Sequence, residues 1–242
     1  MTGESVRDCF QDSFLRRGEE TAITFLRKGR RETEISYFEL DQDANRLANL
    51  FFEMGVRKGD RVVFFFDTSL FFVTAHLAVQ KLGAVSVPLN PGFKKSEMAY
   101  LLGDVKAALV LCGPAQEPMI REIDPELKTL VIDPQEPYQD LGFFKQPSEI
   151  LSPITVSPED PALIIYTSGT TGKPKGAVLT QRNLLHDARN IIRVWEITSS
   201  DVLCHALPLF HVHGLCFALH TSLLAGASGL MLDAFSPETV IP

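Results

Sequence analysis

The sequence predicts an α/β protein with two sheet-containing subdomains, in which mostly parallel strands are flanked by helices. Two observations predict this. Short apolar runs bounded by glycine, proline or asparagine alternate with segments of helical spacing, which is typical of a largely parallel sheet. A proline-rich stretch without either periodicity, residues 134–161, reads as a linker or surface excursion between a first subdomain at 1–133 and the start of a second at 162–242.

The first subdomain begins with a predicted strand pair. Residues 23–26 and 32–36 flank the charged turn RKGRR, which contains a glycine. Ser36 has Glu39 three residues later, which is a capping box, and the helical spacing that follows ends at Gly55. The remaining elements are expected to alternate, with strands at 61–66, 85–89, 107–112 and 129–132, and with helices at 69–82, at 94–104 and between the last two strands.

The second subdomain starts with a predicted buried strand at 162–166, which leads into a loop rich in glycine, threonine and lysine. We expect a helix at 181–195, a strand at 202–207, a helix at 214–224 and the beginning of another helix in the final residues, FSPETV. Trp195 and the run Phe64-Phe65-Phe66 are expected to be ordinary core residues.

Composition excludes several classes of protein. The chain has 242 residues, is 45% hydrophobic and 22% charged, and carries a net charge of -7, so it offers no electrostatic footprint for nucleic acid. The most apolar stretch, 62–79, is interrupted by Asp67 and His76, so no membrane span is expected. Four scattered cysteines and a polar N-terminus without a signal peptide fit a reducing, cytoplasmic compartment. Whether the protein forms a homo-oligomer stays open.

The loop Tyr166–Gly176, with the sequence YTSGTTGKPKG, carries the strongest chemical signal. Three glycines let its backbone bend, four serine and threonine hydroxyls can donate to anionic oxygens, and two lysines supply positive charge. These properties suit a polyphosphate. The loop is neither a Walker A motif, because Pro174 follows Lys173 in place of a hydroxyl residue, nor a G-x-G-x-x-G motif.

Along its whole length, this loop resembles the phosphate-loop signature of the adenylate-forming (AMP-binding) enzymes, which include acyl-CoA synthetases, luciferases and the adenylation domains of peptide synthetases. Weaker resemblances to other blocks of that family occur in its order, at residues 35–40, 55–62, 82–91 and 207–215, the last in the acyl-CoA synthetase form PLFHVHG. The resemblance covers only the front of the family. It implies an incomplete adenylate-forming N-terminal domain, so we expect an N-terminal fragment that is inactive alone.

The resemblance implies an ATP-dependent acyl-CoA synthetase. A small carboxylic acid is activated by ATP and Mg²⁺ as an acyl-adenylate, and coenzyme A then accepts the acyl group. The residues implied for the β- and γ-phosphates and the loop end are Thr167, Ser168, Gly169, Thr170, Thr171, Gly172, Lys173, Lys175 and Gly176, with Thr167 also near magnesium. The alternatives are an adenylate-forming enzyme that loads another acceptor, such as a carrier protein, and a noncatalytic nucleotide-binding module.

The histidines after the loop permit two interpretations. His205, His211, His213 and His220, with Cys204 and Cys216, suggest zinc, but the surroundings supply no carboxylate and no standard zinc spacing. We therefore expect His205, His213 and His220 to be packed and hydrogen-bonded. From its place in the PLFH block, the resemblance implies that His211 is a catalytic and substrate-binding residue where carboxylate and α-phosphate meet. It also implies that Gly214 lets the backbone pass close to the substrate.

Overall fold

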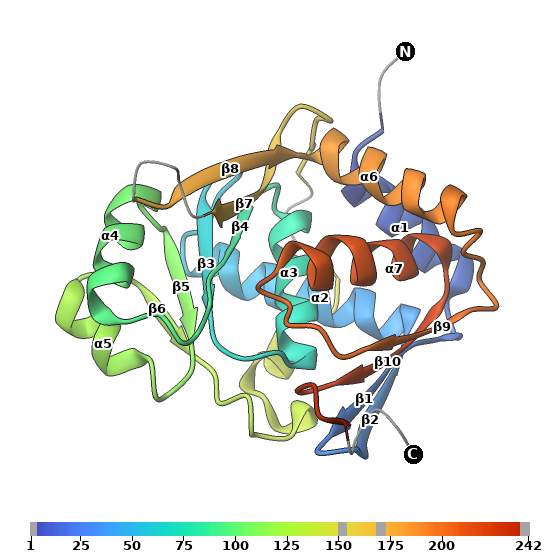
Figure 1. The fold of residues 1–242 in the computed structure, drawn as a ribbon, viewed down its shortest axis with the longest axis horizontal. Coiled ribbons are helices and arrows are strands. Elements are labelled where there is room, and N and C mark those ends of the chain that lie inside the picture. Colours follow the sequence, from blue (N-terminus) through green and yellow to red (C-terminus); the bar gives the residue numbers. More distant parts are fainter. Residues whose placement is uncertain (1–3, 150–153, 168–172, 238–242) are drawn as a thin grey trace.

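The computed structural model describes residues 4–149, 154–167 and 173–237. They form two mixed sheets with flanking helices (Figure 1). One sheet has six strands in the order β6-β5-β3-β4-β7-β8, and the other has four in the order β2-β1-β10-β9. The predicted α/β class with mostly parallel strands is confirmed.

The six-stranded sheet is parallel except at one edge. Its strands are β3 (Arg61–Phe65), β4 (Val85–Pro88), β5 (Leu109–Cys112), β6 (Thr129–Val131), β7 (Pro161–Thr167) and β8 (Lys175–Thr180). Only β7 and β8 pair antiparallel. Strand β8 was not among the predicted elements. It begins at Lys175, within the glycine-rich segment, and pairs antiparallel with β7 to form a hairpin.

The four-stranded sheet joins the two ends of the chain. It contains β1 (Thr21–Arg27), β2 (Arg30–Ser36), β9 (Val202–His205) and β10 (Ser228–Leu232). The β1–β2 hairpin is confirmed, while β1 also pairs in parallel with β10. Strands β7 and β8 join the first sheet and β9 and β10 the second, so each sheet combines strands from the ranges 1–133 and 162–242. Local patterns mark strands, but pairing between strands so distant in sequence depends on tertiary packing.

The helices lie mostly where the spacing predicts them. They are α1 (Val6–Arg17), α2 (Tyr37–Glu53), α3 (Leu70–Lys81), α4 (Lys95–Val105), α5 (Glu117–Ile123), α6 (Gln181–Val194) and α7 (Thr221–Ala225). Helix α7 continues the π-helical segment η3 (His213–His220), and residues 134–161 include two 3₁₀ turns, η1 (Tyr138–Asp140) and η2 (Gly142–Lys145). The capping box of α2 is confirmed, with the Glu39 amide 3.2 Å from Ser36 Oγ and the Ser36 amide 2.8 Å from the Glu39 carboxylate.

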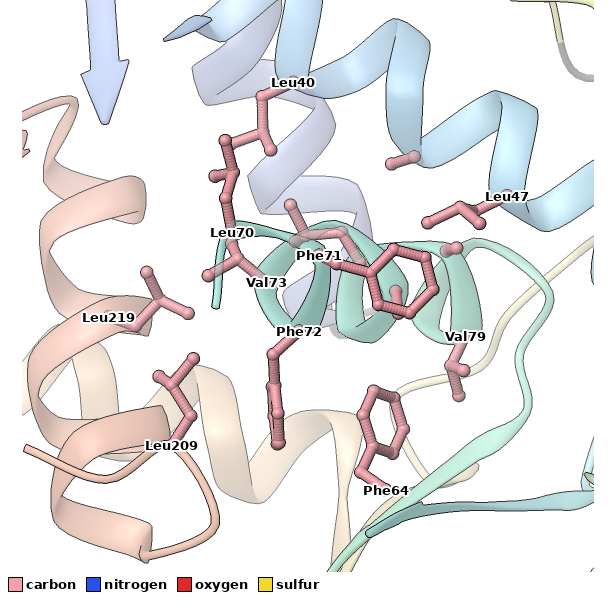
Figure 2. Close-up of a cluster of buried hydrophobic side chains, with 14 of the residues drawn as sticks. Leu40, Leu47, Phe64, Leu70, Phe71, Phe72, Val73, Val79, Leu209 and Leu219 are labelled. Atoms are coloured by element: carbon pink, nitrogen blue, oxygen red, sulfur yellow. The ribbon is translucent and has the colours of Figure 1, made fainter. Parts of the chain in front are cut away.

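Helices α2 and α3 lie between the two sheets, and α4 and α5 cover the outer face of the six-stranded sheet (Figure 1). Figure 2 shows how the middle layer is filled. Phe72 of α3 points toward Phe64 of β3, with ring centroids 4.9 Å apart, and Leu209 and Leu219 approach from the C-terminal part of the chain. The prediction that Phe64-Phe65-Phe66 is core is confirmed, since all three side chains are fully buried.

Trp195 departs from the prediction. It caps the C-terminal end of α6 and is 69% exposed, whereas the buried residues of α6, Leu184, Leu185 and Ala188, lie nearer its start. The helical spacing correctly identified the buried face of α6, but Trp195 lies past the end of the helix, where the described residues leave that face uncovered.

Within the described residues, no helix is long and apolar enough to cross a membrane.

Candidate functional site

The candidate site is formed where strands β3, β4 and β7 end. These neighbours are parallel, so their carboxyl ends lie at the same edge of the six-stranded sheet. In open α/β sheets, ligands bind at this edge, because the loops that follow the strands converge there. The loop of the YTSGTTGKPKG segment leaves from β7, and the strand axes of β3 and β7 are about 10 Å apart at the usual spacing.

The phosphate-loop hairpin is formed by the ends of β7 and β8. Thr167 pairs with Lys175 and Tyr166 with Gly176, and the side chains of Thr167, Lys173 and Lys175 are exposed. A Cβ on Gly176 would lie 2.9 Å from Ile164 Cγ2 and 3.4 Å from the Tyr166 ring, so glycine leaves room for these side chains. The other predicted phosphate-binding residues, Ser168, Gly169, Thr170, Thr171 and Gly172, lie outside the described residues.

The segment around His211 is attached to the same edge of the sheet. The buried Leu209 donates its backbone N–H to Thr68 Oγ1 at 3.1 Å, and Thr68 lies three residues after the end of β3. His211 itself is exposed, and its ring lies 4.6 Å from that of Phe210. Topology therefore brings the phosphate-loop hairpin and the His211 segment, which are far apart in sequence, to one end of one sheet.

Gly214 has a reason within the protein to be glycine. A Cβ there would lie 2.4 Å from the carbonyl oxygen of Pro208, which is closer than any real contact of that kind. The Gly214 carbonyl accepts a hydrogen bond from Nε2 of His205 at 2.9 Å, and burial is the main cause of the lowered pKa of His205. The described residues thus explain this glycine by the close approach of the Pro208 backbone to Gly214, within the protein itself.

A buried histidine pair, which the sequence did not reveal, connects the segment to the rest of the fold. Nε2 of His220 lies 2.8 Å from Nε2 of His76, whose Nδ1 lies 2.8 Å from Ser86 Oγ. Burial lowers the pKa of both rings, to about 3 for His220 and well below the usual value for His76, where the charge of His220 adds to the effect. Both rings are therefore neutral near pH 7, and the pair links α3, β4 and η3.

The cysteines and histidines considered for zinc differ in their exposure. Cys204 is exposed and Cys216 is buried, and burial raises the pKa of the Cys216 thiol to about 12. His213 departs from the expectation of a packed ring: it is exposed, although its ring lies edge-on to Phe217 at 4.7 Å between centroids. Across the three described ranges, no cluster of three or more histidine, cysteine, aspartate or glutamate side chains could hold a metal ion.

An apolar cavity of about 360 Å³ lies beside the His211 segment. Its lining comes from the end of α6, from β9, and from η3 and α7. The lining residues include Trp195, Val202, Leu207, His213 and Phe217. Since Trp195, Val202 and Leu207 are also among the most exposed large apolar side chains, the cavity opens at the outer edge of the four-stranded sheet.

The described side chains at the hairpin fit an anionic ligand. Two exposed ammonium groups, those of Lys173 and Lys175, and the hydroxyl of Thr167 gather at the mouth of one hairpin in a protein whose net charge is -7. Hydroxyl oxygen is also a ligand type that Mg²⁺ accepts alongside phosphate oxygens.

Comparison with known proteins gives a consistent result. The sequence profile described as AMP-binding enzyme matches residues 10–241. Crotonobetaine/carnitine-CoA ligase of Escherichia coli is 31% identical over 247 residues, which cover 97% of this chain and 47% of that protein. The chain thus spans about half the length of the curated relatives that it matches.

Solved structures share the fold. ATP-bound MatB from Rhodopseudomonas palustris is 30% identical, with a TM-score of 0.87 over 98% of this chain and 47% of the other. A long-chain-fatty-acid-CoA ligase (FadD1) from Archaeoglobus fulgidus has a TM-score of 0.86 over 98% of this chain and 48% of its own. At 22% identity, the second likeness supports the fold alone.

Proposed function

The chain belongs to the AMP-binding enzyme family, and from this premise we propose that it is the N-terminal, nucleotide-binding part of an ATP-dependent acid-CoA ligase. The observation that carries the proposal is the position of the exposed Thr167, Lys173 and Lys175 at the carboxyl edge of the parallel strands, the edge to which the His211 segment is also attached. Relatives named as CoA ligases, and a similar structure that holds ATP, support it.

In the proposed first step, a carboxylate oxygen of the acid attacks the α-phosphorus of ATP. The bond from that phosphorus to the oxygen bridging to the β-phosphate breaks, and pyrophosphate leaves. Lys173 and Lys175 neutralise the β- and γ-phosphates, and Thr167 donates to a phosphate oxygen or approaches Mg²⁺. Bound Mg²⁺ withdraws charge from the phosphate oxygens. Because the protein forms no covalent bond here, positioning and charge neutralisation supply the catalysis.

In the proposed second step, the thiol sulfur of coenzyme A attacks the acyl carbon and gives up its proton to solvent. The bond from that carbon to the phosphate oxygen breaks, and AMP leaves with the electron pair. His211 is proposed to orient the carboxylate against the α-phosphate, because its exposed ring lies at the same sheet edge as the hairpin. The proposed substrate is a small carboxylic acid.

The first test measures Mg·ATP binding to this chain by isothermal titration calorimetry. Lys173→Ala is expected to raise the dissociation constant about tenfold or more, because a hydrogen bond to a charged group is lost. Lys145→Ala is the matched control, since Lys145 is exposed on η2, away from the hairpin, and its loss should leave binding unchanged. Equal affinity of Lys173→Ala and the native chain would contradict the assignment.

The second test measures turnover by a form of the protein that extends over the full length of its relatives. AMP formation that depends on coenzyme A supports the ligase. Exchange of pyrophosphate into ATP without use of coenzyme A indicates a different acyl acceptor. Nucleotide binding without either reaction would contradict the proposal and indicate a noncatalytic module.

A further inference from the structure

Helix α4 contacts both arms of the phosphate-loop hairpin. On the β7 arm, Tyr166 donates its hydroxyl hydrogen to Asp104 Oδ2, with 2.6 Å between the oxygens. On the β8 arm, Tyr100 donates to the carbonyl oxygen of Pro174 at 3.1 Å. Tyr100 and Asp104 are four residues apart, so they lie on one face of α4.

Tyr100 also holds the lysine of the hairpin. The ammonium nitrogen of Lys173 lies 5.5 Å from the centroid of the Tyr100 ring, which is within the range of a cation–π contact. A single side chain therefore contacts two consecutive residues, one through its ring and one through its hydroxyl. Lys173 is the residue to which the proposed function assigns the phosphate charge.

These polar contacts are separate from the packing that holds α4 in place. The helix is fixed to the sheet by Met98, Leu101, Leu102 and Val105, all of them buried. Asp104 is exposed and Tyr100 only half-buried. Removing either polar contact therefore leaves the apolar face of α4 intact, and its main consequence falls on the hairpin.

Tyr166 acts as the donor in its pair. Burial is the main cause that raises the pKa of its hydroxyl, and the hydrogen bond to Asp104 raises it further, so the phenol stays protonated at neutral pH. The Tyr166 ring also lies against Gly176, where a Cβ would lie 3.4 Å from Cζ. Asp104 thus fixes the ring against which the β8 arm packs.

We propose that Tyr100 and Asp104 are positioning residues for the phosphate-binding hairpin, which orient its two arms and Lys173 before a nucleotide binds. The inference rests on the proposed function. A hairpin ordered in advance loses less conformational entropy when the polyphosphate binds, so the contacts raise affinity without touching the ligand.

The test compares variants of this chain in Mg·ATP binding and in hydrogen exchange of the backbone amides of Lys175 and Gly176. Tyr100→Phe keeps the ring and removes the hydroxyl, so the dissociation constant should rise about 3- to 10-fold. Tyr100→Leu, which also removes the ring beneath Lys173, should raise it further. Asp104→Ala should act like Tyr100→Phe, whereas Asp104→Asn, whose amide oxygen still accepts from Tyr166, should restore most of the affinity.

Tyr37→Phe is the matched control. Tyr37 donates to the carbonyl oxygen of Ala227 at 2.6 Å, far from the hairpin, so its loss lowers stability but should change neither ATP affinity nor exchange in the hairpin. Native affinity and native exchange in Tyr100→Phe and Asp104→Ala would overturn the inference. If the native chain binds no Mg·ATP, the proposed function fails, and faster exchange in these two variants but not in Tyr37→Phe then decides whether α4 positions the hairpin.

Discussion

The phosphate-loop hairpin and the segment from Leu207 to His220 both bear sequence motifs, yet the fold treats them differently. In the hairpin, the described side chains of Thr167, Lys173 and Lys175 are exposed. In the second segment, Gly214 and His220 are buried and closely packed, whereas His211, which we assign to the substrate, is exposed, as is His213. The difference teaches that one motif can keep its side chains exposed, free for a ligand, while another is held by the close packing of its backbone.

The largest change in stability is expected from Gly214→Ala. Because the new Cβ would lie 2.4 Å from the Pro208 carbonyl oxygen, the backbone must shift. We expect a loss of about 3 kcal/mol in the free energy of unfolding, measured by urea denaturation followed by circular dichroism. The control is Gly103→Ala, at an open position in α4, which should keep or increase stability. If the Gly214→Ala protein is as stable as the native one, close packing at Gly214 does not distinguish this segment from the hairpin.

A somewhat smaller effect should follow acidification. The pKa of His220 is about 3 in the folded protein, against about 6.5 in an unfolded chain, so between these values the unfolded state binds a proton that the folded state does not. Stability is therefore complete above about pH 7 and falls as the pH drops. His220 alone accounts for a loss of about 2 kcal/mol between pH 7 and pH 5, and His76 adds to it in the same direction.

Urea denaturation at several pH values checks this. His220→Gln keeps a side chain that can pair with His76 but does not titrate, so its unfolding free energy should depend less on pH. If the variant and the native chain show the same pH dependence of unfolding free energy, the His76–His220 pair is not the source of the acid sensitivity.

The smallest change in stability is expected in the hairpin. Lys173→Ala and Lys175→Ala remove exposed side chains, so each should alter the free energy of unfolding by less than about 0.5 kcal/mol. Thermal denaturation of the same samples used for the ATP titrations measures this directly. If either substitution lowers the free energy of unfolding by more than about 1 kcal/mol, these lysines stabilise the fold, and the two regions do not differ in the way described.

Much of the fold was predictable because local signals were strong. Ser36 and Glu39 marked the start of α2 through hydrogen bonds made within one turn, and the Phe64 run was recognisable as core from its apolar neighbours. Strand β8 and helix α1 were missed. The β8 strand begins within the glycine-rich segment, whose composition indicates a ligand and not a strand, and α1 lies in a polar stretch with weak helical spacing.

The candidate site shows the same division. The YTSGTTGKPKG string predicts phosphate-binding chemistry, because its glycines, hydroxyls and lysines suit a polyphosphate. Neither the support that α4 gives through Tyr100 and Asp104 nor the pairing of His76 with His220 has a local signal, since the partners of His220 and of Pro174 are 144 and 74 residues away.

The sequence by itself determined the α/β class, the capped helix α2, the phosphate-loop motif and the family, because each depends on residues close together along the chain. Only the tertiary structure decided that β1 pairs with β10, that β7 and β8 belong to the first sheet, and that Gly214 faces Pro208. It also exposed Trp195, which the helical spacing had assigned to the core. The physical reason is that such contacts depend on how whole layers pack, and no periodicity of a single segment records which distant surface it will meet.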